Sequence, residues 1–463
     1  MVKPISTQGA SATLLANSLN KIADLFAKAR NNPDYVGAVL ASYGLMVAQA
    51  LVQILLIPLY LHVLGDYRFG VLTIFMAQVV FGYTILSWPH GFLLRRFSEN
   101  MAAGDAGGFS RFYIAGKLLL LGSSLLCAGG MLWLEAVHSV FFRDAPVALR
   151  GEIMTAMILA AVHFLLLCEI QIEQTILAAA KRQFAVNISM LVGLGVFTAG
   201  VVPWLLSGGG LVGVMVCFLA NDLAMRAVVW WVRRSHPHFR LKISLIGIGS
   251  AIGQMLSGQG GKYLAYALIG ISLQSDMLLI GLWGGPIMAA QYALVWKIAE
   301  MLIQLLARVP LHLQPEFVTM DVTGERDRLA RIYREVWLWM AVGSCMAAVG
   351  YGLLGPWIVR LWVGSAKAPI DIYLYLLAGG AIFWISLSRL PATLAQSMAA
   401  MRGLLWVSGS ELIAKFALIL LLFPYVGLAA PLLAISLVHG LGGAVAYWLL
   451  GRKLVAPGGF NSG

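Results

Sequence analysis

Ionisable side chains stand inside long apolar runs of this 463-residue sequence. A charge at the centre of a membrane-spanning helix costs at least about 2.5–3.5 kcal/mol on insertion scales, so each of these residues needs a physical reason. Paired charges, ion paths and binding sites are the usual reasons. The cations are Lys262, Lys297, Arg308, Arg389 and Lys415, and the carboxylates are Glu169, Glu173, Asp222, Asp276, Glu300 and Glu411.

Two of the cations have an acidic residue about one helical turn away. Glu300 follows Lys297 by three residues, and Glu411 precedes Lys415 by four. Residues at these spacings are neighbours on one helix face and can form an ion pair. The sequence therefore predicts a local pair in each case, and for Lys415 a structural pairing with Glu411 is favoured over a binding role.

The carboxylates of the first half show two different situations. Asp222 and Arg226 are four residues apart on one face, which predicts that they neutralise each other. Glu169 and Glu173 also share a face, but the next cation along the chain is Lys181. These two glutamates are therefore candidate ion-coupling residues.

Other buried polar residues have no local partner at all. Lys262 and Arg389 have no acidic residue within a turn. Five cations at varied depths predict a water-filled cavity for an anion, where arginine offers a planar fork to phosphate oxygens and lysine a point charge. Asp276 is either a third ion-coupling candidate or a capping or loop carboxylate, and His163 is expected to be a packed core histidine.

The composition shows which elements must position these residues. The sequence is 60% hydrophobic and 11% charged, which is typical of a polytopic membrane protein. A spanning helix needs about 20 apolar residues. This rule predicts twelve spans, over 38–64, 70–94, 112–134, 153–179, 184–206, 211–232, 246–281, 287–309, 335–355, 372–399, 404–423 and 428–450. The seventh is long and is interrupted by Gly258, Gly260, Gly261 and Gly270, so it is expected to be kinked or unwound.

The positive charge of the loops predicts how the chain is oriented. One set of loops carries most of the Lys and Arg residues and the opposite set carries five. By the positive-inside rule both termini are cytoplasmic, and the net charge of +12 reflects topology and not a nucleic-acid partner. A mixed segment over 14–29 is expected to lie on the membrane surface.

Residues at the ends of the apolar runs recur 220 positions later, which predicts that the chain contains two copies of one unit. Gly65 falls on Gly285, Gly104 on Gly324 and Arg389 on Glu169. The repeat predicts an N-terminal segment 1–35, a first six-helix lobe 36–234, a cytoplasmic linker 235–245, a second lobe 246–453 and a tail 454–463. Two parallel copies would leave a central cavity between the lobes, with Glu169 and Arg389 at equivalent depths facing each other across it.

The loops are too short for a catalytic domain, so the activity is expected inside or across the membrane. The largest loop, around 314–334, is cytoplasmic and charged. The four cysteines, Cys127, Cys168, Cys217 and Cys345, lie in apolar segments and are interpreted as core residues without disulfides or metal. No cofactor is predicted.

Short motifs at the helix junctions resemble a known family. The segment 58–70, with Pro58, Tyr60, Gly65 and Gly70, resembles the first junction of the polysaccharide transporter family in the multidrug/oligosaccharidyl-lipid/polysaccharide flippase superfamily. The segment 276–292 resembles the corresponding second-half junction, although Ala289-Ala290 replaces the expected Val-Gly pair. The segment 315–317 resembles a proline turn after the eighth helix.

This resemblance implies an all-α protein of about twelve helices that works by alternating access in the bacterial inner membrane. The substrate would be an undecaprenyl-pyrophosphate-linked oligosaccharide, with membrane lipids and other polysaccharide-assembly proteins as partners. The residues expected to line the cavity are Lys262, Lys297, Arg308, Arg389, Lys415, Glu169 and Glu300, and the ion-coupling candidates are Glu169, Glu173 and Asp276. The alternatives are a cation-coupled multidrug exporter of the same fold, which would favour carboxylates in its cavity, and a membrane polymerase or ligase, which would need a large outer loop.

Overall fold

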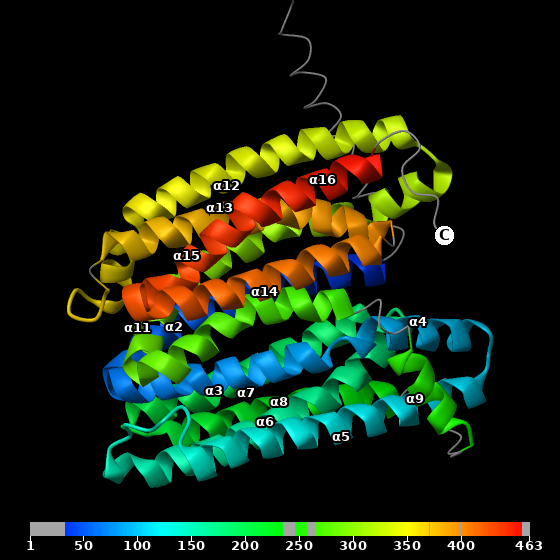
Figure 1. Ribbon diagram of the computed structural model, residues 1–463. Coiled ribbons are helices and arrows are strands. Elements are labelled where there is room, and N and C mark those ends of the chain that lie inside the picture. Colours follow the sequence, from blue (N-terminus) through cyan, green and yellow to red (C-terminus); the bar gives the residue numbers. More distant parts are fainter. Residues whose placement is uncertain (1–32, 235–245, 258–263, 370, 399, 456–463) are drawn as a thin grey trace, which may run out of the picture.

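The computed structural model describes residues 33–234, 246–257, 264–369, 371–398 and 400–455, and every regular element among them is helical (Figure 1). The helices of the first half are α2 (Pro33–Val63), α3 (Gly65–Leu86), α4 (Pro89–Ala102), α5 (Ala106–His138), α6 (Val147–Ala179), α7 (Gln183–Leu206) and α8 (Leu211–Arg234). Those of the second half are α9 (Ile248–Leu256), α11 (Leu264–Thr323), α12 (Arg326–Val363), α13 (Ile372–Ser397), α14 (Met401–Val426), η2 (Gly427–Ala429), α15 (Ala430–Leu437), the π-helix η3 (Val438–Gly443) and α16 (Ala444–Val455). The expected surface helix over 14–29 and the linker 235–245 lie outside the described residues.

The helix lengths agree with about twelve membrane crossings. Within the part of the chain that the structure describes, ten runs are long and apolar enough to span a bilayer, and two of them contain 57 and 55 residues. At about 1.5 Å per residue, each of these two is more than twice as long as a bilayer core of about 30 Å. Gly285 interrupts the first run and η2 the second, so each supplies two crossings.

Glycines with left-handed backbone conformations mark matching positions in the two halves. Gly65 and Gly285 have φ values of 76° and 72°, and Gly104 and Gly324 have values of 67° and 72°. A residue with a Cβ atom rarely adopts this conformation. The two pairs, each separated by 220 residues, therefore terminate helices in the same way in both halves. The division of the chain into lobes stays a prediction.

Several expected span boundaries are wrong, because the helices do not end where the apolar runs end. The span expected over 70–94 ends at Leu86. Pro89 begins the separate helix α4, which contains Arg95 and Arg96. Hydrogen bonding from Arg95 lowers the pKa of the exposed Glu99 carboxyl there. The expected loop over 314–334 is mostly helix, since α11 runs to Thr323 and includes the supposed proline turn.

The kink predicted at Gly258, Gly260 and Gly261 lies outside the described residues. The short helix α9 ends at Leu256, and α11 begins at Leu264. Helix α9 packs against α5, and Gln254 accepts a 3.5 Å hydrogen bond from Arg96 on α4. Gly270 is not part of this break, because it lies within α11.

Helices α3 and α11 make the main contact between the two halves. A Cβ atom added to Gly281 of α11 would lie 2.8 Å from the side chain of Ile74 on α3. One added to Gly70 of α3 would lie 1.8 Å from the carbonyl oxygen of Pro286. The close packing of these backbones therefore depends on glycine on both sides.

Two polar contacts join the halves at the same end of the molecule. The Lys367 ammonium, in the loop between α12 and α13, lies 2.7 Å from Asp66 at the start of α3. The Trp362 indole donates a 2.7 Å hydrogen bond to the carbonyl oxygen of Ile54 on α2. The two halves are thus in direct contact at the end that the loop charges assign to the outside.

Substituting Gly70 by Ala should separate α3 from α11 at this end. Overpacking of a close contact typically costs about 1–3 kcal/mol, and here the clash is with a backbone carbonyl that cannot rotate away. We expect a lower melting temperature of the purified protein. Gly122→Ala on α5, where nothing lies within 4 Å of the added atom, is the matched control. An unchanged melting temperature for Gly70→Ala would contradict this packing.

Candidate functional site

The charges within the spans are held in separate groups in the two halves. Helix α6 packs between α5 and α8 in the first half and presents Glu169 and Glu173 to both neighbours. Lys117 of α5 pairs with both glutamates, Arg226 of α8 with Glu169 and Arg233 of α8 with Glu173. We call these five residues, with Tyr113, the first-half cluster.

Distances in the first-half cluster show that Glu173 is its centre. Lys117 Nζ and Arg233 Nη1 lie 2.8 and 2.7 Å from its carboxylate oxygens. The Tyr113 hydroxyl donates a 2.7 Å hydrogen bond to Glu173 and accepts one of 3.0 Å from Arg233. The two glutamates therefore do have close cations, which the sequence conceals because the partners are on other helices.

The expected pair between Asp222 and Arg226 is wrong. Asp222 is fully buried and lies 2.5 Å from His163 Nδ1 of α6, while Arg226 contacts Glu169. The two side chains contact different residues because α6 places a polar side chain opposite each of them, His163 opposite Asp222 and Glu169 opposite Arg226. His163 is a buried histidine, as predicted, and its packing includes this carboxylate.

The expected pair between Lys415 and Glu411 is also wrong. Lys415 of α14 is completely buried and lies 2.6 Å from Asp276 of α11. It also donates to the carbonyl oxygen of Ser272, and Tyr292 donates a 3.3 Å hydrogen bond to Asp276. Asp276 is therefore no cap or loop residue, because it is the counter-ion of a lysine from another helix.

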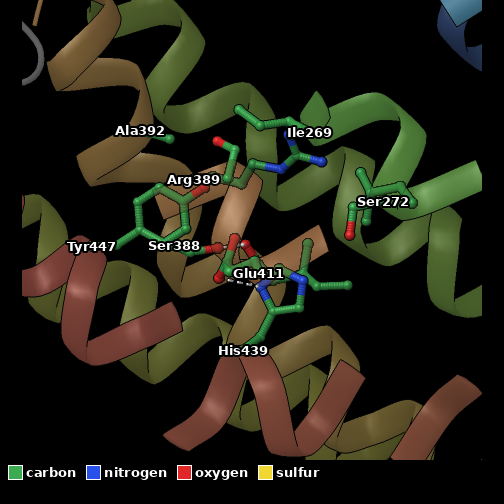
Figure 2. Close-up of a pocket in the computed structure, with 11 residues that line it drawn as sticks. Ile269, Ser272, Ser388, Arg389, Ala392, Glu411, His439 and Tyr447 are labelled. Atoms are coloured by element: carbon green, nitrogen blue, oxygen red, sulfur yellow. Dashed lines mark hydrogen bonds and ion pairs between the residues drawn. The ribbon is translucent and has the colours of Figure 1, made fainter. Parts of the chain in front are cut away.

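Glu411 instead faces His439 at 3.0 Å, beside a small cavity (Figure 2). His439 lies in the π-helix η3, a type of helix found often at functional sites. A Cβ atom on Gly443 would lie 1.8 Å from the Glu411 carboxylate, so the glycine allows this approach. The cavity measures about 20 Å³, which is room for a single water molecule.

Arg389 of α13 lines the same small cavity, together with Tyr447. Among the described residues no carboxylate forms an ion pair with it, and its Nε atom is buried without a hydrogen-bond partner. The expected approach of Arg389 to Glu169 does not occur, since Glu169 is held by Lys117 and Arg226 in the first half.

A polar face on α11 brings together three of the predicted site residues. Lys297 pairs with Glu300 at 2.9 Å, as their spacing predicts, and Gln304 donates to Glu300 at 3.3 Å. Arg308 follows one turn later and has no ion-pair partner among the described residues. One further turn on, the His312 ring stacks on Tyr43 of α2 with centroids 5.6 Å apart. We call Lys297, Glu300, Gln304 and Arg308 the α11 polar face.

The predicted residues that the structure describes thus form separate groups of contacts. Glu169 and Glu173 belong to the first-half cluster, Lys415 and Asp276 form a buried pair, and Arg389 lines a one-water cavity. The α11 polar face holds the remaining three described residues, and Lys262 lies outside the described residues. The first-half cluster is separated from the groups on α11, α13 and α14 because α3 and α11 pack directly against each other between them.

Sequence reasoning missed Lys117, Tyr113, Arg233 and His439. Lys117 was inside the predicted third span and carried the same signal as the other buried cations, a charge in an apolar run. Arg233 was assigned to a loop, and His439 had no acidic residue within a turn. Within the described residues no group of three or more His, Cys, Asp or Glu side chains could hold a metal ion, and all four cysteines are free.

Solved structures with the same fold are membrane transporters. An inward-facing multidrug resistance MATE family transporter of the MOP superfamily matches with a TM-score of 0.68 at 15% identity, covering 88% of this chain and 94% of its own. The lipid II flippase MurJ, in an inward closed conformation, matches with 0.67 at 10% identity, over 90% and 89%. The eukaryotic MATE transporter AtDTX14 matches with 0.62 at 13% identity, over 93% and 100%.

The chain therefore shares its fold with a MATE family transporter of the MOP superfamily and with the lipid II flippase MurJ. No protein-family model and no curated protein matches the sequence. The fold is shared by multidrug transporters and a lipid flippase, so the substrate must be argued from this chain's own residues.

Proposed function

We propose that this protein is a flippase that moves an undecaprenyl-pyrophosphate-linked oligosaccharide from the inner to the outer leaflet for surface polysaccharide synthesis. The observation that supports this substrate is the imbalance of charge within the spans. Six carboxylates, Glu169, Glu173, Asp222, Asp276, Glu300 and Glu411, each have a cationic or histidine partner. Among the described residues Arg308 and Arg389 have no carboxylate partner.

The unpaired charges favour an anionic substrate. The six carboxylates already have partners, whereas Arg308 and Arg389 are two guanidinium groups without a carboxylate partner among the described residues. Charge-assisted hydrogen bonds from arginine to phosphate are among the strongest available to a protein. We propose that Arg308 and Lys297, on the partly exposed α11 polar face, contact the pyrophosphate, and that Lys262 and Arg389 take part in another step of the cycle.

Coupling to an ion is proposed for the carboxylates. Glu169, Glu173 and Asp276 are each held by a cation in this structure. An ion or proton that binds one of these carboxylates would displace its cation. The helix that carries the cation would then lose its ion pair with the helix that carries the carboxylate. Such a change would give the transporter a second arrangement of helices, as alternating access requires.

We propose a location in the bacterial inner membrane with both termini in the cytoplasm. A cysteine replacing Gly208, in the turn between α7 and α8, should react with a membrane-impermeant thiol reagent added outside intact cells. A cysteine replacing Gly104, in the turn between α4 and α5, should react only after permeabilisation. The reverse labelling pattern would contradict the orientation. Both glycines have positive φ values, 67° at Gly104 and 79° at Gly208, so the melting temperature of each cysteine variant is measured to show that it is folded.

The substrate is tested by reconstitution. Purified protein in liposomes that contain a fluorescent undecaprenyl-pyrophosphate-linked oligosaccharide should accelerate its movement between leaflets, read as accessibility to a dithionite quencher. Undecaprenol carrying the same fluorophore and no pyrophosphate should move no faster than in protein-free liposomes. Equal acceleration of both lipids, or of neither, would contradict the proposed substrate.

The second candidate is a cation-coupled multidrug exporter, which the match to the MATE transporter favours. The pair of Glu411 and His439 beside a one-water cavity is the arrangement that would carry a coupling proton in such an exporter. This candidate predicts that a pH gradient drives a cationic dye out of the same liposomes, while the lipid-linked substrate stays where it is.

A further inference from the structure

The hollow beside the first-half cluster has the features of a binding site. It measures about 140 Å³ and lies between α5 and α8, with α6 as its floor. One water needs about 10–15 Å³ by the same measure, so the hollow has room for a phosphate group. Its polar lining comes from Tyr113, Glu169, Glu173, Arg226 and Arg233.

The cluster carries more positive than negative charge. Lys117, Arg226 and Arg233 supply three cations, whereas Glu169 and Glu173 supply two carboxylates, which leaves one positive charge. A net charge at membrane depth is costly unless an anion or water accompanies it. The hollow is therefore matched to one further negative charge.

The two arginines have donors to spare. A guanidinium has five N–H donors, and the contacts among the described residues use only the Nη1 atom of Arg226 and of Arg233. The Arg226 side chain is 49% exposed although eight residues separate it from the end of α8. Its remaining donors can therefore reach a ligand without the loss of Glu169.

The surroundings of the hollow indicate a lipid and not a soluble ligand. Leu118 of α5 is 51% exposed and Trp230 of α8 is 57% exposed, so both walls present apolar surface to the bilayer. Arg234 stacks on Trp230, and tryptophan near a basic helix end is typical of the membrane interface. In Figure 1, α5, α6 and α8 lie on the opposite side of α3 from α12, α13 and α14.

We propose that this hollow binds the phosphate of a lipid headgroup in the leaflet next to the Lys/Arg-rich loops. Arg226 and Arg233 hold the phosphate oxygens, Lys117 balances the charge of both glutamates, and the acyl chains follow the exposed walls of α5 and α8. The site goes beyond the proposed transport function, because it requires no particular substrate and lies away from the α11 polar face.

Binding to the full-length purified protein in detergent tests the proposal. Native mass spectrometry would follow titrations with dioleoylphosphatidylglycerol, with dioleoylglycerol, which lacks the phosphate, and with inorganic pyrophosphate. We expect saturable binding of the phospholipid and at least about tenfold weaker binding of the other two probes, since neither offers both phosphate and chains. Dioleoylglycerol binding as tightly would leave only an apolar groove, and pyrophosphate binding as tightly would mean a free-anion site; either result overturns the lipid assignment.

Two variants should change the affinity in opposite directions. Arg226→Gln removes the surplus charge and should weaken phosphatidylglycerol binding about tenfold, whereas Glu169→Gln frees Arg226 and Lys117 and should strengthen it about tenfold. Arg331→Gln, on the exposed surface of α12, is the control for overall charge and should change nothing. Melting temperatures show whether each variant is folded. A Glu169→Gln variant that is folded and binds no more tightly than the wild type overturns the proposal, because a purely structural network predicts no gain in affinity.

Discussion

Replacing Asp276 by Asn should destabilise the protein more than any other single neutralisation of a charge within the described spans. Lys415 would then be completely buried with no counter-ion. Breaking a buried ion pair by removing one partner typically costs about 3–5 kcal/mol. Lys415→Met should be similarly harmful, because Asp276 would keep only its hydrogen bond from Tyr292. Fluorescence-detected size-exclusion chromatography after heating gives the melting temperatures.

The double variant Asp276→Asn with Lys415→Met distinguishes an ion pair from two independent polar contacts. Removing both charges removes the need for either, so the double variant should be more stable than each single variant. Asp66→Asn is the matched control, since its pair with Lys367 is exposed and such pairs contribute about 0–1 kcal/mol. Additive losses in the double variant would contradict the pairing of Asp276 with Lys415.

Neutralising Arg308 or Arg389 should reduce transport at least about tenfold. Each arginine lacks a carboxylate partner among the described residues, so its removal leaves no acid stranded. A hydrogen bond to a charged group contributes about 1.5–3 kcal/mol, which is the loss expected if substrate binding limits the rate. Arg389→Gln keeps most of the side-chain volume and removes the charge. The measurement is surface-glycan production in a complementation strain, with protein levels followed by immunoblotting.

Arginine-to-lysine variants refine this expectation. Lysine keeps the charge but loses the planar fork, so Arg308→Lys and Arg389→Lys should recover only part of the activity. Lys297→Gln should be milder than Arg308→Gln, because Lys297 already shares its charge with Glu300 at 2.9 Å. If Arg308→Gln and Arg389→Gln are both made at normal levels and export glycan normally, Arg308 is not a pyrophosphate contact and Arg389 has no part in the transport cycle.

The close packing of α3 against α11 also explains why Glu169 and Arg389 do not meet in this structure. The sequence places Glu169 and Arg389 at equivalent positions of two copies, which suggests that they face each other. Equivalent positions in parallel copies face each other only if the same sides of both copies are turned to the shared interface. Here α3 and α11 occupy that interface, Glu169 contacts Lys117 and Arg226 within the first half, and Arg389 lines the small cavity of the second half.

The sequence by itself determined the crossings and the glycine junctions at Gly65 and Gly285. Apolar runs of about 20 residues predict spans because the bilayer leaves the backbone no other way to satisfy its hydrogen bonds. Gly65 and Gly285 could be matched by an offset alone, since a left-handed residue at a helix junction requires glycine locally. The pair of Lys297 and Glu300 was predictable for the same reason, because its geometry is set within a single helix turn.

Only the tertiary structure decided which charges meet across helices. Asp276 and Lys415 are 139 residues apart, and Glu173 meets Arg233 from 60 residues away. Helical spacing predicted that Lys415 pairs with Glu411 and Asp222 with Arg226, and both predictions were wrong. A local pair on a helix surface contributes only about 0.2–0.5 kcal/mol, whereas a buried charge left without a counter-ion costs several times more. The packing that relieves the larger penalty therefore selects the partner, and that packing is a property of the whole fold.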